Sequence, residues 1–123
     1  MGFGGMDSAA VHGRLTAERT HTQERLSALE AEFRALVAAG DGTNIDDEHD
    51  PEGATIAFER QQVAALVEQA RTRLIDLDRA LGEWQRGAEG GYGICERCGQ
   101  PIAAGRLEAR PDARTCIACA VDR

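Results

Sequence analysis

Hydrophobic residues recur at helical spacing in the first third of the chain. Asp7 or Ser8 can cap a helix N-terminus, and no proline follows before Ala39. Gly40 then takes the position after the last helical turn, where glycine often ends a helix. The pattern predicts a helix over about 7–39. Four apolar residues, spaced three, four and three positions apart, put one stripe on its surface: Leu26, Leu29, Phe33 and Leu36.

A second helix is predicted from about Thr55, because apolar residues there follow a heptad repeat. A companion series lies four residues after members of the first, as in the seam between two packed helices. Gly87 and the glycines that follow it end the pattern. The two series are Ile56, Val63, Ala70, Leu77 and Trp84, and Val67, Leu74 and Leu81.

Two helices of roughly 30 residues, each with one apolar stripe, bury those stripes most simply by pairing antiparallel. Each arm would be roughly 45–50 Å long at 1.5 Å per residue. The segment "DGTNIDDEHDPEGA", residues 41–54, would form the tip, and no Lys or Arg lies between Arg34 and Arg60. We therefore predict an all-α fold: a coiled-coil hairpin over 7–88 with an acidic tip at 41–54. Residues 1–6 are expected to be disordered.

The charge and composition of the chain disfavour two classes of function, bulk nucleic-acid binding and insertion into a membrane. The chain has 123 residues, a net charge of −7 and 14 arginines with no lysine, which disfavours bulk binding to nucleic acid. Apolar runs are too short to span a membrane, and the start "MGFGGMDSAA" lacks the features of a signal peptide. We expect a cytoplasmic location, where paired cysteines more often bind metal or act in catalysis than form disulfides.

All four cysteines lie near the C-terminus, as Cys95-x2-Cys98 and Cys116-x2-Cys119 with 17 residues between the pairs. This spacing is typical of zinc sites, because two such turns supply a tetrahedron of thiolates. Four protein ligands leave no coordination position for water, so the Zn²⁺ would be structural and would not activate water. The chain is not expected to be an enzyme. Redox or disulfide pairs are the competing interpretation. The predicted zinc finger spans residues 89–123.

A DNA-binding finger is a further alternative. Arg106, Arg110 and Arg114 lie between the cysteine pairs, but Glu108 and Asp112 balance part of their charge. DNA-reading modules generally present a longer basic surface to phosphates and bases. Direct sequence-specific DNA binding is therefore not expected.

The stretch "YGICERCGQPIAAGRLEARPDARTCIACA" resembles the C-terminal finger of the DksA/TraR family of bacterial transcription regulators. The resemblance goes beyond the cysteines and includes Tyr-Gly before the first pair, "RLEARP" between the pairs, and Ile117 within the second. Upstream, "HDPEGATIAFER" (49–60) is similar to the tip and following helix of the same family.

This resemblance implies a regulator that binds RNA polymerase directly. In the family, the hairpin enters the secondary channel, its acidic tip approaches the catalytic region, and the finger stays at the rim. Carried over to this chain, the tip residues that modulate polymerase are Asp50, Glu52 and Asp47, and Arg60 is a candidate channel contact. Two registers stay open: Asp47-x-x-Asp50 has the family spacing, whereas alignment on Ala54 and Thr55 selects His49 and Glu52.

Some family members act together with ppGpp, so ppGpp is a further candidate partner. The chain ends four residues after Cys119 and has no lysine, which argues against a ppGpp response. Two other functions remain as alternatives: a zinc-finger DNA-binding regulator, and a transcript-cleavage factor whose tip carboxylates hold magnesium at the polymerase active site.

Overall fold

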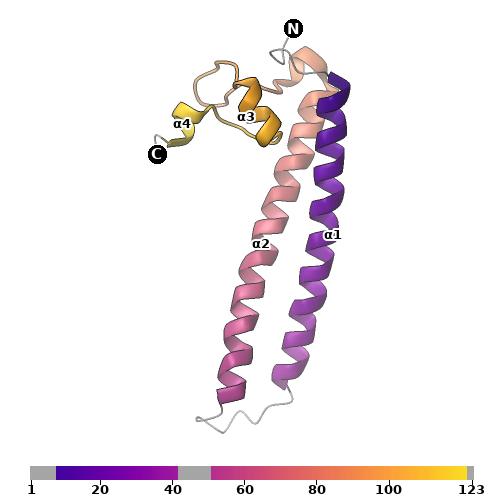
Figure 1. The fold of residues 1–123 in the computed structure, drawn as a ribbon, viewed down its shortest axis with the longest axis vertical. Coiled ribbons are helices and arrows are strands. Elements are labelled where there is room, and N and C mark those ends of the chain that lie inside the picture. The colour runs from indigo at the N-terminus through magenta and orange to yellow at the C-terminus, as the bar shows by residue number, and fades with distance from the viewer. Residues whose placement is uncertain (1–7, 42–50, 122–123) are drawn as a thin grey trace. The chain divides into compact units, whose positions relative to one another are not determined.

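The computed structural model describes residues 8–41 and 51–121 (Figure 1). The N-terminal segment 1–6 and the tip residues Asp47 and Asp50 lie outside the described residues. So does the side chain of Glu52, although its backbone belongs to the second helix. No helix in the described part is both long and apolar enough to cross a membrane.

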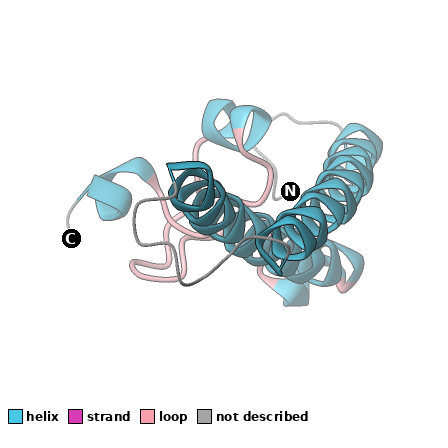
Figure 2. Ribbon diagram, turned by 90° about the horizontal axis from the view of Figure 1, so that it is seen from below, coloured by secondary structure: helices cyan, strands magenta, loops and turns pink. Residues whose placement is uncertain are grey.

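Helices make up the regular structure of the described residues (Figure 2). The long helices are α1 (Ser8–Asp41) and α2 (Pro51–Gln85), which run antiparallel to each other. A 3-10 turn, η1 (Gly87–Gly90), leads to the finger, which holds α3 (Ala104–Ala109) and α4 (Ile117–Val121). The all-α prediction, with a long helical hairpin and a C-terminal four-cysteine module, is confirmed.

Two helix boundaries differ from those predicted. Helix α2 begins at Pro51, where proline suits a first helical position because its missing N–H would have no intrahelical partner. Helix α1 continues to Asp41, so the prediction that Gly40 ends it was wrong. A Cβ at Gly40 would lie 3.3 Å from Arg60 Nη1 and 3.9 Å from Ile56 Cγ2. Glycine at this position therefore gives room to side chains of α2 instead of ending α1.

Contacts divide the chain into two compact units. The first comprises Met1–Thr20 and Leu74–Arg123, and the second comprises His21–Arg73. The predicted division into a hairpin (7–88) and a finger (89–123) stays a prediction, since these units group the finger with the adjoining ends of both helices.

The second unit is a seam between α1 and α2. Arg71 of α2 bonds to Glu30 of α1 at 3.1 Å and to Glu68 of its own helix at 3.0 Å, which ties the two helices together on the surface. Thr22 takes a seam position and is only 3% exposed, although it is a polar residue outside the predicted apolar stripe. The buried seam residues are Thr22, Leu26, Leu29, Val63, Val67 and Ala70.

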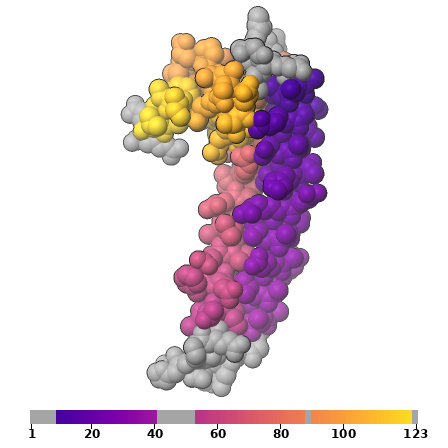
Figure 3. Space-filling view, viewed as in Figure 1, coloured from indigo at the N-terminus to yellow at the C-terminus, as the bar shows by residue number. Residues whose placement is uncertain are grey.

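The first unit has one hydrophobic core, to which both helices and the finger contribute. In Figure 3 the orange atoms of the finger lie directly against the N-terminal part of α1. Arg19 of α1 pairs with Asp78 of α2 beside this core. Leu81 and Trp84 pack at its edge. The core residues are Val11, Leu15, Leu77, Ala80, Tyr92, Cys95, Ile102 and Leu107.

The chain leaves α2 through glycines that no other residue replaces without strain. Gly87 and Gly91 have φ of 70° and 80°, in the left-handed region that favours glycine. A Cβ on Gly90 would lie 1.9 Å from the carbonyl oxygen of Glu83, which is a steric clash. These glycines let the chain turn back sharply, so that Tyr92 and Cys95 reach the core.

Leu77→Ala tests this core, with Ile75→Ala as its matched control on the same helix. Leu77 is fully buried, whereas Ile75 is 67% exposed. We expect Leu77→Ala to lower the free energy of unfolding by about 2–5 kcal/mol. Ile75→Ala should change it by less than about 0.5 kcal/mol. Urea denaturation of the zinc-loaded protein measures both, and equal losses would contradict the assigned core.

Candidate metal centre

The first cysteine pair lies in a tight backbone turn. The Cys95 N–H donates to the Gln100 carbonyl at 2.8 Å, and the Gly99 N–H donates to the Cys95 carbonyl at 2.9 Å. Gly99 has a φ of 77°, which the turn requires and glycine adopts readily. The turn therefore directs the thiols of Cys95 and Cys98 to the same side.

The second pair lies at the start of α4. Cys116 precedes the helix, and its carbonyl accepts the Ala120 N–H at 2.9 Å, so Cys119 follows one helical turn later. The two pairs are joined by the Glu96 N–H, which donates to the Arg114 carbonyl at 2.9 Å. Local backbone structure thus brings together two pairs separated in sequence.

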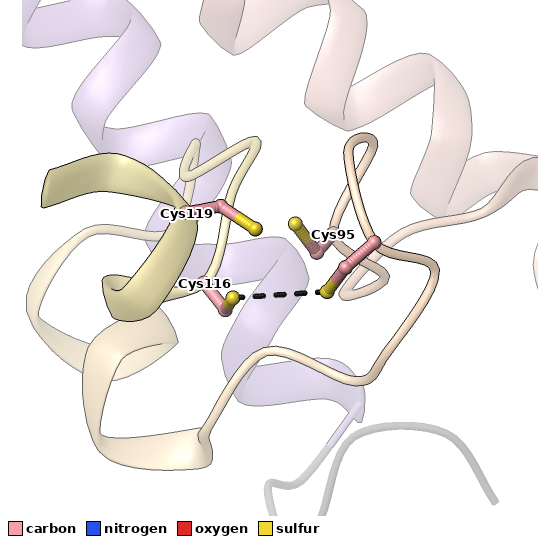
Figure 4. A group of neighbouring side chains, drawn as sticks. Cys95, Cys116 and Cys119 are labelled. Carbon is pink, nitrogen blue, oxygen red and sulfur yellow. Dashed lines mark hydrogen bonds between the residues drawn. The ribbon is translucent and has the colours of Figure 1, made fainter. Parts of the chain in front are cut away.

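The four sulfur atoms form one cluster. The candidate ligand atoms of Cys95, Cys98, Cys116 and Cys119 all lie within 4.8 Å of one another. The sulfurs of Cys98 and Cys116 are 3.8 Å apart, and Figure 4 shows the side chains facing a common centre. A tetrahedral zinc ion with bonds of about 2.3 Å requires sulfur–sulfur distances of about 3.8 Å. The donors and spacing therefore fit zinc, and all four cysteines are free of disulfides.

Electrostatics also favour a cation at this centre. Burial raises the pKa of the Cys95 thiol, but hydrogen bonds from the backbone of Cys116, Cys98 and Arg97 outweigh burial and lower the pKa to about 6. For Cys119, hydrogen bonds to the side chains of Cys116 and Cys95, with burial, raise the pKa to about 12. Cys95 therefore loses its proton easily, whereas the neighbouring groups disfavour the thiolate form of Cys119. A divalent cation would stabilise all four thiolates together, because zinc binds cysteine as thiolate.

Neither of the histidines in the described residues, His12 and His21, joins the cluster. His12 stacks on Trp84 with ring centroids 4.7 Å apart, and His21 lies on the exposed surface of α1. Among the described residues, the four cysteines are the one group of His, Cys, Asp or Glu side chains close enough to hold a metal. The predicted ligand residues are thus brought together, whereas the acidic tip lies outside the described part.

Several contacts that support the centre were not predicted. The Tyr92 hydroxyl donates to the Pro111 carbonyl at 2.8 Å, and Arg106 Nε donates to the Thr115 carbonyl at 2.8 Å. Asp112 is only 3% exposed, although the sequence suggested a surface residue that balances charge. Tyr92 and Pro111 stand in the motif that carries the family resemblance, so the motif marked them without showing their contact.

The chain is similar to known proteins both in the finger and in the helical region. A family model described as "Prokaryotic dksA/traR C4-type zinc finger" matches residues 90–123. The structure of transcription factor DksA2 from Pseudomonas aeruginosa matches with a TM-score of 0.71 and 30% identity, over 92% of this chain and 79% of that one. The chain belongs to the DksA/TraR family. The predicted family is thus confirmed, and the family's finger type together with the sulfur geometry makes the centre a zinc site.

Two proteins of Bacillus subtilis (strain 168) are also similar to this DksA/TraR member. "General stress protein 16O" is 33% identical over 101 residues, which are 81% of this chain and 60% of that protein. "Uncharacterized protein YteA" is 39% identical over 69 residues, which are 56% of this chain and 28% of that protein. The chain thus spans less than two thirds of the length of either relative.

Removal of one cysteine tests the zinc site. Cys98→Ser should abolish stoichiometric zinc binding, because a hydroxyl at this position does not replace the thiolate. Ala118→Ser is the matched control, since it introduces the same residue at an exposed position between two of the cysteines. We expect one zinc ion per chain in the wild type and in this control by elemental analysis. Full zinc content in Cys98→Ser would contradict the ligand assignment.

Ionisation of Tyr92 makes the stability of the protein depend on pH in the alkaline range. Burial, then the charge of Asp112, raises the pKa of Tyr92 to about 12 from its ordinary 10.0. Below pH 10 the phenol is neutral in both states, so its stabilising effect is complete. Between pH 10 and 12 only the unfolded state ionises, so the free energy of unfolding falls as the pH rises.

The chain contains a single tyrosine, so phenolate absorbance reports this residue alone. We expect the folded protein to titrate near pH 12. Unfolding of Tyr92→Phe should lose the part of the pH dependence that belongs to the phenol. A phenol that titrates near pH 10 in the folded protein would contradict this assignment.

Proposed function

We propose that this chain is a DksA-type regulator of transcription that acts by binding RNA polymerase directly. The observation that carries the proposal is the match to the transcription factor DksA2, which covers 92% of this chain and so extends beyond the finger to the helices. A match confined to residues 90–123 would support a zinc module alone.

The zinc centre supports a binding role. Four cysteine ligands complete the tetrahedral coordination of zinc, which leaves no position at which the metal activates water. Zinc therefore stabilises the finger, and three cysteines, Cys95, Cys116 and Cys119, belong to or pack against the core shared with α1 and α2. We accordingly propose no catalytic reaction for this chain.

The finger's arginines favour a protein partner over DNA. Arg106 donates to the Thr115 carbonyl, and Arg114 bonds to Glu96 and to Asp76 at 3.2 and 3.3 Å. Side chains engaged in this way are not available as a row of phosphate contacts, which DNA binding at physiological salt needs. The net charge of −7 disfavours DNA further.

The distribution of acidic residues suggests how the hairpin acts. Residues 41–54 contain six Asp or Glu residues and no Lys or Arg, whereas acidic and basic residues alternate closely in the finger. We propose that this segment enters the secondary channel and alters the electrostatic environment of the polymerase active site. Charges act over about 8–10 Å at physiological salt, so the tip has to come close to its target. The proposed tip residues are Asp47, Asp50 and Glu52.

A tip variant with three neutral residues tests this function: Asp47→Asn, Asp50→Asn and Glu52→Gln combined. The control variant combines Glu24→Gln, Glu32→Gln and Glu108→Gln, which removes the same charge from exposed helical positions. We expect both variants to bind polymerase in a pull-down. The effect of the tip variant on promoter transcription should be about tenfold smaller than that of the wild type, which corresponds to about 1.4 kcal/mol. The control variant should have the same effect as the wild type.

Three results would contradict the proposal. The first is no binding of the wild-type protein to polymerase, or binding that a secondary-channel competitor leaves unchanged. The second is tight binding to duplex DNA alone with a steep salt dependence, which would identify a DNA-binding finger. The third is cleavage of backtracked RNA that the tip variant loses, which would identify a cleavage factor. Each assay is run with and without ppGpp, so that its role is measured directly.

A further inference from the structure

Helix α2 presents a polar row to the finger beside the shared core. Asp76, Arg79 and Glu83 are spaced three and four residues apart, so they lie on one face of the helix. Ala80 lies on the same side, is 1% exposed, and belongs to the core cluster that also holds finger residues such as Leu107. The first unit therefore holds an interface in which α2 offers both an apolar surface and charged side chains to the finger.

Arg79 bridges α2 to the loop that follows α3. Its Nη2 donates to the Asp112 carbonyl at 3.0 Å, and its Nη1 donates to Glu83 Oε1 at 2.9 Å. The Nε of Arg79 is buried and has no hydrogen-bond partner in the described part of the chain. Burial of an unpaired donor is unfavourable, so the contacts of the two Nη groups hold this side chain against the finger.

Arg114 makes a second bridge. Its Nη1 donates to Asp76 Oδ1 at 3.3 Å, and its Nε donates to Glu96 Oε1 at 3.2 Å. Glu96 follows the ligand Cys95 directly, and the backbone N–H of Glu96 donates to the Arg114 carbonyl at 2.9 Å. One guanidinium thus joins α2 to the part of the finger in which both cysteine pairs meet.

Neither zinc nor the apolar core explains how the finger is oriented on α2. All four ligands belong to the finger, so the metal ties its two cysteine pairs to each other and not to α1 or α2. Apolar burial is non-directional, whereas hydrogen bonds weaken steeply away from their preferred angle. Arg79 and Arg114 both make directional contacts between the finger and α2, and we call this pair the arginine clasp.

We propose that Arg79 and Arg114 are positioning residues that fix the orientation of the finger on α2 and thereby set the affinity for polymerase. This inference rests on the proposed function. A partner that contacts both the finger and the helices binds only molecules whose finger is correctly oriented. The apparent affinity therefore falls in proportion to the fraction of such molecules.

The clasp is separable from folding. The side chains of Arg114 and Asp76 are 47% and 21% exposed, and exposed ion pairs contribute little to the free energy of unfolding. Loss of this pair therefore leaves a folded, zinc-loaded protein whose finger samples more orientations. Affinity for polymerase should fall while thermal stability and zinc content stay nearly constant.

Asp76→Asn and Glu96→Gln form a matched pair of variants, because each neutralises one acid bonded to Arg114. Asp76→Asn breaks the bridge to α2, whereas Glu96→Gln breaks a contact inside the finger. Arg79→Lys keeps the charge but does not reproduce the fork that reaches both Glu83 and Asp112. Residual dipolar couplings of the zinc-loaded protein compare the orientation of finger amides with that of amides in Leu74–Gln85.

In the wild type and Glu96→Gln, we expect one alignment tensor to fit both sets of couplings. In Asp76→Asn and Arg79→Lys, the finger couplings should shrink and no longer fit. Polymerase affinity should fall roughly two- to fivefold in these two variants, in keeping with a weak ion pair. The exchange of charges in Asp76→Arg with Arg114→Asp should restore both readouts when it is combined with Glu96→Gln, which removes the carboxylate that would repel the new one. The loss of a direct polymerase contact would not allow this rescue.

Unchanged couplings in Asp76→Asn and Arg79→Lys would overturn the inference whatever polymerase does. Changed couplings with unchanged affinity would overturn the link between orientation and binding. If the wild type does not bind polymerase, the proposed function fails, whereas the couplings still decide whether the clasp orients the finger.

Discussion

Burial of the Cys95 sulfur within a hydrophobic core is the constraint on which the finger and the adjoining helix ends depend. Cys95 is 1% exposed and packs in one cluster with Leu15 of α1 and Leu77 of α2. A thiolate in such a place is costly unless a cation and hydrogen-bond donors compensate for it. Backbone hydrogen bonds supply part of that compensation, and zinc supplies the rest. Metal binding and the docking of the finger on the helices are therefore parts of one equilibrium, because both use the same buried residue.

The two units are stabilised by different means as a result. The unit with the finger has a core built from four chain segments, so its helical ends are held by contacts distant in sequence. The unit His21–Arg73 relies on the seam of α1 and α2 and on surface pairs such as Arg71 with Glu30. Thr22 and Ala70 bury less apolar area in that seam than leucine would, so each contributes less to pairing. Loss of zinc therefore acts first on the unit that contains the finger.

Periodic and spaced features were predictable from the sequence, and non-periodic contacts were not. The heptad repeat identified Val63, Val67 and Leu77 as buried, because one helix packed on another produces that period. The cysteine spacing identified the metal centre. In contrast, Ala80 lies outside the heptad, and it is buried in the core that residues of the finger share with α1 and α2. Asp112 and Arg79 look like solvated charges in sequence, since nothing local shows that the chain returns to meet α2. The prediction that Gly40 ends α1 was wrong for a similar reason. The role of Gly40 depends on the side chains of Ile56 and Arg60 in α2, which lie 16 and 20 residues away in sequence.

The finger's charged residues show why a zinc module need not bind nucleic acid. Its arginines would be free for phosphate if the finger stood alone, but here they contact the protein itself. Arg106 bonds within the finger, and Arg114 spans from the finger to Asp76 of α2. An arginine engaged with a carboxylate has to release that partner before it contacts phosphate, so part of the gain from the new contact is lost. The same bonds that attach the finger to the helices thus reduce its affinity for DNA, and they leave the acidic segment 41–54 as the region of greatest charge density. This distribution of charge supports the proposed partner, which would receive an acidic hairpin, over a partner that would bind a basic finger.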